Sequence, residues 1–223
     1  TVYAGETLTL AETFAVPANG DNYTQTLACS GADDIDLTDG ELTIAPGDED
    51  ITCTFTNARI SNAVSLTKAW VNGAAGDAVD LSIAGGSGAT DGSSTVGGSP
   101  TDATATATAL AGDTVTLTEA FTQGGGNYDT SLACTDGNDD EVTVTQVGAT
   151  SYEIVMPADE VECTFTNTRI EVELTLAKDW VNAVAGEAVD VTVTRGATEI
   201  DVLTATAAGG TQTITDDTPV TAY

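Results

Sequence analysis

The sequence predicts an all-β protein made of tandem antiparallel β-sandwich repeats. Runs rich in Val and Thr alternate apolar and polar residues, as in DTVTLTEAF at 113–121 and EVTVTQV at 141–147. This alternation is typical of half-buried strands. Turns rich in Gly, Asp and Asn separate the runs, for example at 124–126 and 136–138. Many short strands joined by polar turns indicate a two-sheet sandwich, and no segment has a pattern that predicts a helix.

An internal repeat predicts the domain organisation. WVNGAAGDAVD at 70–80 recurs as WVNAVAGEAVD at 180–190, with 8 of 11 residues identical. CTFTNARI at 53–60 recurs as CTFTNTRI at 163–170, so the period is about 110 residues. We therefore predict three parts, which are the second half of a repeat at 1–60, a complete repeat at 61–169 and the first half of another at 170–223.

The charge of the chain makes several kinds of partner unfavourable. Five Lys and Arg against 35 Asp and Glu give a formal net charge of −30, and there is no His. Such a surface repels phosphate and anionic lipid, so we expect no nucleic-acid partner and no membrane partner. No apolar run has the length of a membrane span, and no signal peptide is visible. Because the chain begins with Thr1, we expect it to be processed or cut from a longer protein.

The four cysteines form two pairs at matching repeat positions, Cys29 with Cys53 and Cys134 with Cys163. Without His or a C-x-x-C motif a zinc site is not expected, and we predict no metal and no cofactor. Two disulfides in an oxidising compartment fit better, with buried free thiols as the alternative. Acid-rich turns are a weaker candidate for calcium, because their spacing fits no standard loop and solvated turns explain them better. These turns contain Asp33, Asp34, Asp36, Asp39, Asp136, Asp139, Asp140 and Glu141.

Three polar residues, Lys68, Glu119 and Asn167, lie in phase with apolar residues on their predicted strands. Residues two apart in a strand face the same side, so all three are expected to point inward. A buried Lys, Glu or Asn without a partner is costly, and we therefore expect the three to meet. Glu12, Asn57 and Lys178 occupy the same positions in the two half repeats. The in-phase apolar residues are Val64, Leu66, Trp70, Val115, Leu117, Val161, Cys163 and Phe165.

The chemistry of such a trio allows a covalent bond. Lys68 and Lys178 are the only lysines of the chain and occupy equivalent positions. A lysine in an apolar pocket loses its proton readily, and a neighbouring carboxyl group can polarise a carboxamide and pass protons. A neutral amine beside an activated Asn carbonyl can displace ammonia and form a Lys–Asn amide. The alternatives are a buried Lys–Glu ion pair capped by Asn, or strand-end residues that reach solvent.

The segments that carry the trio also resemble a known family. LTKAW at 66–70, VTLTEAF at 115–121 and CTFTNTR at 163–169 occur in this order. In this order and spacing they resemble the collagen-adhesin B-type domains (prealbumin-like, SpaA-type), which are isopeptide-forming repeats of bacterial pilins and surface adhesins. The Pro-Gly-Tyr segment usual after the Glu is replaced by residues 124–128, and the cysteine pair is not a general feature of that family.

The resemblance implies an immunoglobulin-like or prealbumin-like sandwich with a spontaneous isopeptide bond between its first and last strands. In this chain Lys68 would be the nucleophile, Asn167 the electrophile and Glu119 the catalyst. Lys178, Glu12 and Asn57 match the same motif positions within separate half repeats.

Our leading functional hypothesis is therefore a non-enzymatic structural module, an acidic secreted repeat of an extracellular filament, pilus or adhesin stalk at the cell surface. Neighbouring copies of the repeat, head to tail, are the expected partners. One alternative is a carbohydrate- or protein-binding surface module, although only 5% of the residues are aromatic. Another is the accessory domain of a secreted enzyme, which would need a catalytic neighbour.

Overall fold

The computed structural model describes residues 1–31, 36–38, 40–48, 50–97, 104–216 and 220–222. Strands dominate these residues, and the one helical element among them is a short 3₁₀ helix, η1 (Pro17–Asn22). The prediction of an all-β, antiparallel fold is confirmed. None of the described residues belongs to a helix with the length and apolar character needed to cross a membrane.

The chain divides into two compact units, Thr1–Gly126 with Thr130–Asn167, and Asn127–Asp129 with Thr168–Tyr223. We call residues 1–60 the N-terminal segment, residues 61–169 the central sandwich and residues 170–223 the C-terminal segment. These names follow the bounds predicted from the repeat, and the bounds themselves stay a prediction.

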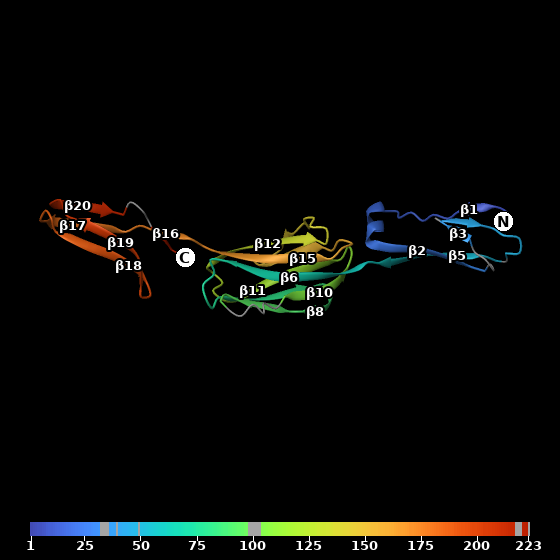
Figure 1. The fold of residues 1–223 in the computed structure, drawn as a ribbon, viewed down its shortest axis with the longest axis horizontal. Coiled ribbons are helices and arrows are strands. Elements are labelled where there is room, and N and C mark those ends of the chain that lie inside the picture. Colours follow the sequence, from blue (N-terminus) through green and yellow to red (C-terminus); the bar gives the residue numbers. More distant parts are fainter. Residues whose placement is uncertain (32–35, 39, 49, 98–103, 217–219, 223) are drawn as a thin grey trace. The chain divides into compact units, whose positions relative to one another are not determined.

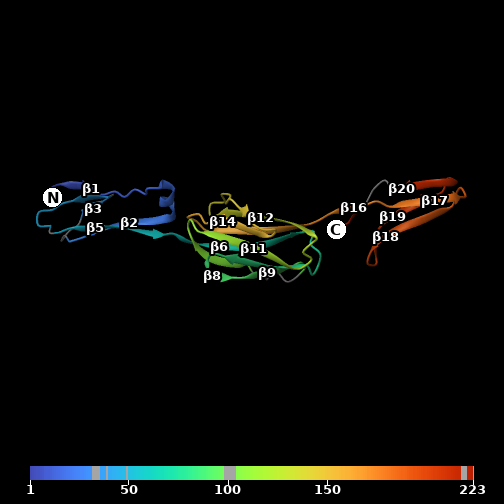
Figure 2. The ribbon, with the colours of Figure 1, turned by 180° about the vertical axis from the view of Figure 1, so that it is seen from behind.

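The central sandwich contains two five-stranded sheets (Figures 1 and 2). The first sheet has the order β12 (Tyr128–Asp136), β15 (Val161–Arg169), β6 (Ser61–Val71), β10 (Ala105–Leu110) and β8 (Ser87–Thr90). The second has the order β13 (Thr145–Gln146), β14 (Ser151–Val155), β11 (Thr114–Gln123), β7 (Ala78–Ala84) and β9 (Gly92–Thr95). The strand that begins the sandwich, β6, is therefore the neighbour of the strand that ends it, β15.

Alternate residues of both sheets meet in one hydrophobic core. Val64 and Leu66 of β6, Val115 and Leu117 of β11, and Phe165 of β15 are all fully buried. The two-residue period of these strands puts their other side chains toward solvent, as the sequence pattern predicts.

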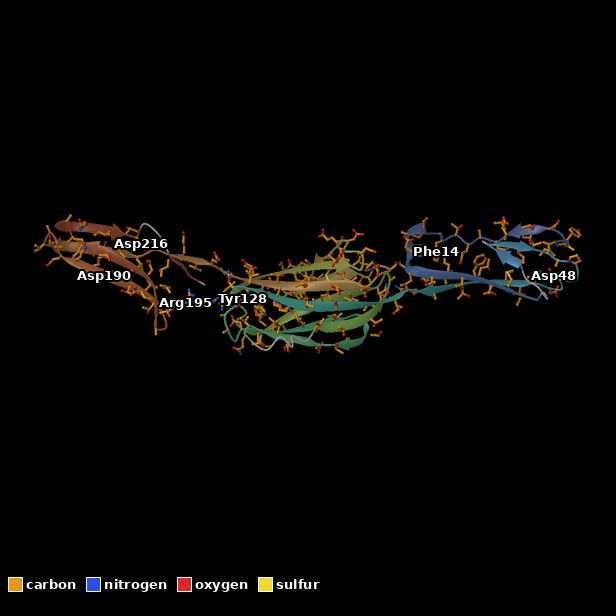
Figure 3. All side chains as sticks on the ribbon, in the orientation of Figure 1. Phe14, Asp48, Tyr128, Asp190, Arg195 and Asp216 are labelled. Carbon is orange, nitrogen blue, oxygen red and sulfur yellow. A yellow bond between two sulfur atoms is a disulfide. The ribbon has the colours of Figure 1, made fainter. Side chains whose placement is uncertain are left out.

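The N-terminal segment contains two smaller sheets. One has the order β1 (Thr7–Thr9), β4 (Glu41–Thr43) and β3 (Asp36–Thr38), and the other pairs β2 (Tyr23–Ser30) with β5 (Thr52–Arg59). Phe14, labelled in Figure 3, packs against Tyr23 with their ring centroids 5.4 Å apart. The register of the second sheet pairs Cys29 with Cys53 and Gln25 with Asn57.

The C-terminal segment contains three strand pairs. They are β16 (Val172–Leu174) with β21 (Val220–Ala222), β17 (Ala177–Ala183) with β20 (Gly210–Thr215), and β18 (Ala188–Arg195) with β19 (Thr198–Thr206). The repeat is visible in the backbone, because Asn72 and Asn182 both have a left-handed φ, of 56° and 53°. Asn tolerates this conformation better than most residues, and it lies just after the end of β6 in one repeat and at the irregular end of β17, before Ala183, in the other.

Candidate functional site

Three strands of the central sandwich bring Lys68, Glu119 and Asn167 together. The three residues come from β6, β11 and β15 respectively, and we call them the central trio. The Lys68 Nζ lies 3.1 Å from the Glu119 Oε2, and the side chains of both residues are completely buried. The Asn167 Nδ2 donates a 2.8 Å hydrogen bond to the other carboxylate oxygen, Oε1. One carboxyl group therefore contacts both the amine and the carboxamide.

The surroundings of Lys68 favour its neutral form. Burial lowers the pKa of Lys68 from 10.5 to about 8, although the neighbouring Glu119 charge opposes the shift. The Nζ also lies 4.7 Å from the ring centroid of Trp70 and donates to the Phe165 carbonyl oxygen at 3.3 Å. Trp70 is held in place by a 3.0 Å hydrogen bond from its Nε1 to the buried Ser94 Oγ. The amine therefore has a fixed position and a lowered affinity for its proton.

The carboxamide of Asn167 is held at both ends. Its Oδ1 accepts a 2.9 Å hydrogen bond from the Thr130 Oγ1, while its Nδ2 is bound to Glu119. A donor on the carbonyl oxygen stabilises negative charge that develops there during nucleophilic attack. Our sequence reasoning missed Thr130, although it lies in phase with Leu132 and Cys134 on β12. Because residues two apart in a strand share a face, this spacing could have indicated that Thr130 points inward.

A tyrosine completes the wall of the site. Tyr152 of β14 packs edge-on against Phe165, with ring centroids 5.6 Å apart. Burial is the main cause that raises the pKa of Tyr152, and the Glu119 charge adds to it. The ring therefore contributes apolar surface around the trio and stays neutral at physiological pH.

The equivalent residues of the N-terminal and C-terminal segments form only parts of this site. The Asn57 Nδ2 donates a 2.8 Å hydrogen bond to the Glu12 Oε1, which reproduces the contact between Asn167 and Glu119. Lys178 belongs to the other compact unit, where its Nζ lies 4.5 Å from the ring centroid of Trp180 and donates to the Asp179 carbonyl oxygen. Each segment thus has the local geometry of one part of the trio.

The cysteines form two disulfides, Cys29–Cys53 between β2 and β5, and Cys134–Cys163 between β12 and β15. The acid-rich turn at 136–141 is capped internally, because the Asp136 Oδ1 accepts hydrogen bonds from the backbone N–H groups of Asn138 and Asp140. Within the described residues no cluster of three or more metal-ligating side chains occurs. Asp33, Asp34 and Asp39 of the other acid-rich turn lie outside the described residues.

The solved structures that resemble the chain include two of a bacterial adhesin from Mobiluncus mulieris that contains intramolecular disulfide, isopeptide and ester bond cross-links. One has 14% sequence identity and a TM-score of 0.36, and covers 60% of this chain and 54% of its own. The other, in a second crystal form, has 13% identity and a TM-score of 0.37, and covers 69% and 63%. The chain therefore spans less than two thirds of either adhesin chain. No curated protein matches it.

A family model gives a direct assignment. The model of the prealbumin-like fold domain of SpaA type matches residues 1–59 and again residues 64–169, which together make up most of the chain. The two matches correspond to the N-terminal segment and the central sandwich. The resemblance inferred from the sequence motifs is thus confirmed, and the chain belongs to the family of SpaA-type prealbumin-like fold domains.

Proposed function

We propose that the chain is a mechanical module of an extracellular bacterial filament, pilus or adhesin stalk, stiffened by a Lys68–Asn167 isopeptide bond and two disulfides. The observation that carries this proposal is the buried Glu119 carboxyl group, which contacts the Lys68 amine at 3.1 Å and the Asn167 carboxamide at 2.8 Å. A structural role for this family agrees with the adhesin structures that the chain resembles. No enzymatic activity is proposed.

The reaction can be written with these groups alone. Glu119 takes a proton from the Lys68 ammonium, and the neutral amine attacks the Asn167 Cγ. The Thr130 hydroxyl stabilises the negative charge on the Asn167 Oδ1. Glu119 then delivers this proton to the carboxamide nitrogen and accepts the second proton from the attacking Lys68 nitrogen, while the C–N bond breaks and ammonia leaves. Glu119 passes the second proton to the departing ammonia, so the products are one Lys–Asn amide and one ammonium ion, and Glu119 is again a carboxylate.

The position of the bond explains a mechanical role. The chain enters the central sandwich through β6 and leaves it through β15, and the bond would join these two neighbouring strands. Tension along the chain would then pass from Lys68 directly to Asn167. The 98 residues between them (69–166) would carry no load. The sandwich would therefore transmit force without extending.

Intact mass of the reduced protein tests the bond. The wild type should weigh one ammonia less than its sequence mass. Glu119→Gln, which keeps the shape of the side chain but cannot shuttle the proton, should have the full mass for its sequence. The matched control Glu12→Gln changes the equivalent residue of the N-terminal segment and should keep the ammonia deficit in the monomer. A wild type of full mass contradicts the proposal.

Two physical consequences should accompany the mass change. Closing a loop of about 100 residues stabilises by about 4–5 kcal/mol in the chain-entropy treatment of crosslinks, so Glu119→Gln should lose stability of this order. Under reducing conditions, single-molecule pulling on Glu119→Gln should release about 320–350 Å of chain from the central sandwich, at about 3.3–3.6 Å per residue. The wild type should release almost none of it.

A further inference from the structure

One buried polar residue of the central sandwich, Ser94, lies outside the central trio. Apart from Lys68, three polar residues in the described part of the chain are buried, and two of them, Glu119 and Asn167, belong to the trio. Ser94 of β9 is the third, and it is 3% exposed. Its Oγ accepts a 3.0 Å hydrogen bond from the Trp70 Nε1. A buried hydroxyl group costs free energy unless it is paired, and an apolar residue would avoid that cost, so the position of the indole is what Ser94 adds.

Trp70 lies beside the amine of the trio, and contacts from the opposite sheet fix its ring. The Lys68 Nζ lies over the indole, 4.7 Å from the ring centroid. Lys68 and Trp70 are two residues apart on β6, so they share a face of that strand. That spacing leaves the indole free to turn about its side-chain bonds. Ser94 of β9 and Phe121 of β11, whose ring lies edge-on at 6.2 Å, hold it in one orientation.

The hydrogen bonds of the amine already use all of its hydrogens. The Lys68 Nζ lies 3.0 Å from the Ala69 carbonyl oxygen, 3.3 Å from the Phe165 carbonyl oxygen and 3.1 Å from the Glu119 Oε2. These three acceptors match the three hydrogens of an ammonium group. The face of the indole ring differs from them, because it attracts positive charge through its quadrupole without accepting a particular proton. Trp70 can therefore stabilise a charged nitrogen whichever hydrogens that nitrogen retains.

Amide formation needs such a partner at one step. When the Lys68 nitrogen attacks the Asn167 Cγ it forms a fourth bond, so positive charge develops on this nitrogen and negative charge on the Asn167 Oδ1. Thr130 donates a hydrogen bond to that oxygen. Glu119 has by then taken the first proton and is neutral, so its charge no longer faces the nitrogen. The indole face, together with the two carbonyl oxygens, then faces the positive charge in a buried site, where a cation–π contact is strongest.

The C-terminal segment has the same Trp without the serine. The ring centroid of Trp180 lies 4.5 Å from the amine of the lysine two residues earlier, so the strand alone brings these two side chains together. In the central sandwich Val79 pairs with Ser94, and the equivalent Val189 pairs with Ala205. The buried Trp180 Nε1 has no hydrogen-bond partner among the described residues. Ser94 is thus not required to bring Trp and Lys together, which leaves the orientation of the indole as its contribution.

We propose that Trp70 is a catalytic residue of the crosslinking site and that Ser94 is its positioning residue. The indole face stabilises the positive charge that develops on the attacking Lys68 nitrogen, while the Thr130 hydroxyl stabilises the negative charge on the carboxamide oxygen. Ser94 holds the ring in the orientation that this requires. The proposal rests on the proposed function, because it concerns the rate at which the Lys68–Asn167 bond forms.

The rate at which new chains lose ammonia tests the proposal. The full 223-residue chain is made by cell-free synthesis, samples are stopped in acidic denaturant, and intact mass after reduction gives the crosslinked fraction. Trp70→Leu should slow the loss about thirtyfold, the rate equivalent of a buried cation–π contact. Ser94→Ala should slow it about fivefold, the equivalent of one buried hydrogen bond, and Ser94→Thr should retain most of the wild-type rate. Trp180→Leu, the matched change in the other compact unit, should have no effect.

A double-mutant cycle shows whether Ser94 acts through the indole. Trp70→Phe keeps an aromatic face but has no N–H group to donate to Ser94. Ser94→Ala should therefore slow the reaction in the wild-type background and leave the rate unchanged in the Trp70→Phe background. An equal loss in both backgrounds would show that Ser94 only supports the fold, and would overturn its positioning role.

Titration of the free amine tests the indole without the reaction. The variant Asn167→Ala/Lys178→Arg has one lysine, Lys68, so a single ε-carbon resonance of isotope-labelled lysine reports its charge. Burial sets the pKa of this amine at about 8. Trp70→Leu in this background should lower the pKa further, because the ammonium form loses the ring face while Glu119 stays in place. A higher pKa would show that the ring only excludes water from the amine, and would overturn the proposal.

The outcomes also separate this proposal from the proposed function. A bond that forms at the same rate in Trp70→Leu and in the wild type overturns the role of Trp70 and leaves the bond itself intact. A wild type of full mass contradicts the proposed function and with it any catalysis, whereas the titration still shows whether the indole stabilises the charged amine. A rate that falls in Trp70→Leu but not in Ser94→Ala supports the catalytic residue and overturns the positioning residue.

Discussion

The central sandwich and the N-terminal segment contain nearly the same strand, CTFTNTR at 163–169 and CTFTNAR at 53–59, in different surroundings. Phe165 is completely buried, whereas Phe55 is 37% exposed. Both strands have the same alternation and the same paired strand on one side, with β12 next to β15 and β2 next to β5. The difference lies on the other side, where β6 pairs with β15 but no strand among the described residues pairs with β5. Burial at this position is thus decided by the complementary half of the sandwich.

The two lysines show the same dependence. Lys68 and Lys178 both lie over the Trp two residues further along their strands. The strand itself therefore sets this local geometry. Among the described residues Lys68 alone of the two has a carboxyl group at 3.1 Å, because in the central sandwich β11 lies opposite β6, whereas no such strand is described opposite β17. The reactive arrangement is a property of the assembled sheets.

The largest expected effect comes from truncating the two phenylalanines. Phe165→Ala should lower the free energy of unfolding by about 3–5 kcal/mol, the usual cost of a cavity at a buried aromatic residue. Phe55→Ala should cost about 1 kcal/mol or less in monomeric protein, because the side chain is already partly in water. Denaturant unfolding followed by Trp70 fluorescence in a Trp180→Phe background measures the first, and circular dichroism the second. Equal costs would contradict the comparison.

A smaller effect is expected from the titration of Lys68 in protein that lacks the bond. In Asn167→Ala the amine stays free, with a pKa of about 8 when folded against 10.5 when unfolded. Between these values the unfolded chain holds a proton that the folded chain does not, so the free energy of unfolding rises with pH. The lysine should thus cost about 3 kcal/mol at pH 7 and progressively less up to pH 10.5.

The control for this titration is the double variant Asn167→Ala/Lys68→Met, which lacks the amine but keeps Glu119 and Tyr152. The difference in stability between the single and double variants should shrink as the pH rises from 8 to 10.5. A difference that stays constant over this range would show that Lys68 is not desolvated by the fold.

The smallest expected effect is a difference between the rates at which the two disulfides are reduced. Cys134 and Cys163 are buried, while Cys29 and Cys53 are half-buried and Cys53 lines an open groove. Because exchange requires a thiolate to reach the sulfur, a mild reductant should open Cys29–Cys53 first, by about tenfold in rate. Timed alkylation and peptide mapping give the order. Simultaneous reduction would indicate that the core of the central sandwich opens as easily as the N-terminal segment.

The sequence predicted a strand well where that strand pairs with another strand on each side. Alternation and turns indicated β6, β11 and β15, and all three occur as long strands. The same patterns predicted strand length less well in the outer segments. There β1 covers only Thr7–Thr9, although its counterpart β11 covers Thr114–Gln123. In the central sandwich the second half of β11 pairs with β7, and Glu119 lies opposite Leu81. Without that partner the chain around Glu12 leaves the strand conformation.

For the candidate site, the two-residue period correctly indicated that Lys68, Glu119 and Asn167 share the interior face. It could not indicate that Glu119 lies between the other two, since this depends on how β11 packs across from β6 and β15. Nor did it single out Thr130, because the phase rule treats a Thr among apolar residues as ordinary in a strand. Contacts between distant strands decide both points, and a local pattern contains no information on them.

The central claim is that a completed sandwich, and not the motif alone, makes the lysine reactive. Peptide mapping of the purified monomer by mass spectrometry, after reduction and digestion with a Glu-specific protease, tests it most directly. We predict a branched peptide that joins Lys68 to Asn167, together with linear peptides containing Lys178 and Asn57. A linear Lys68 peptide, or a crosslinked Lys178 in the monomer, would contradict the account.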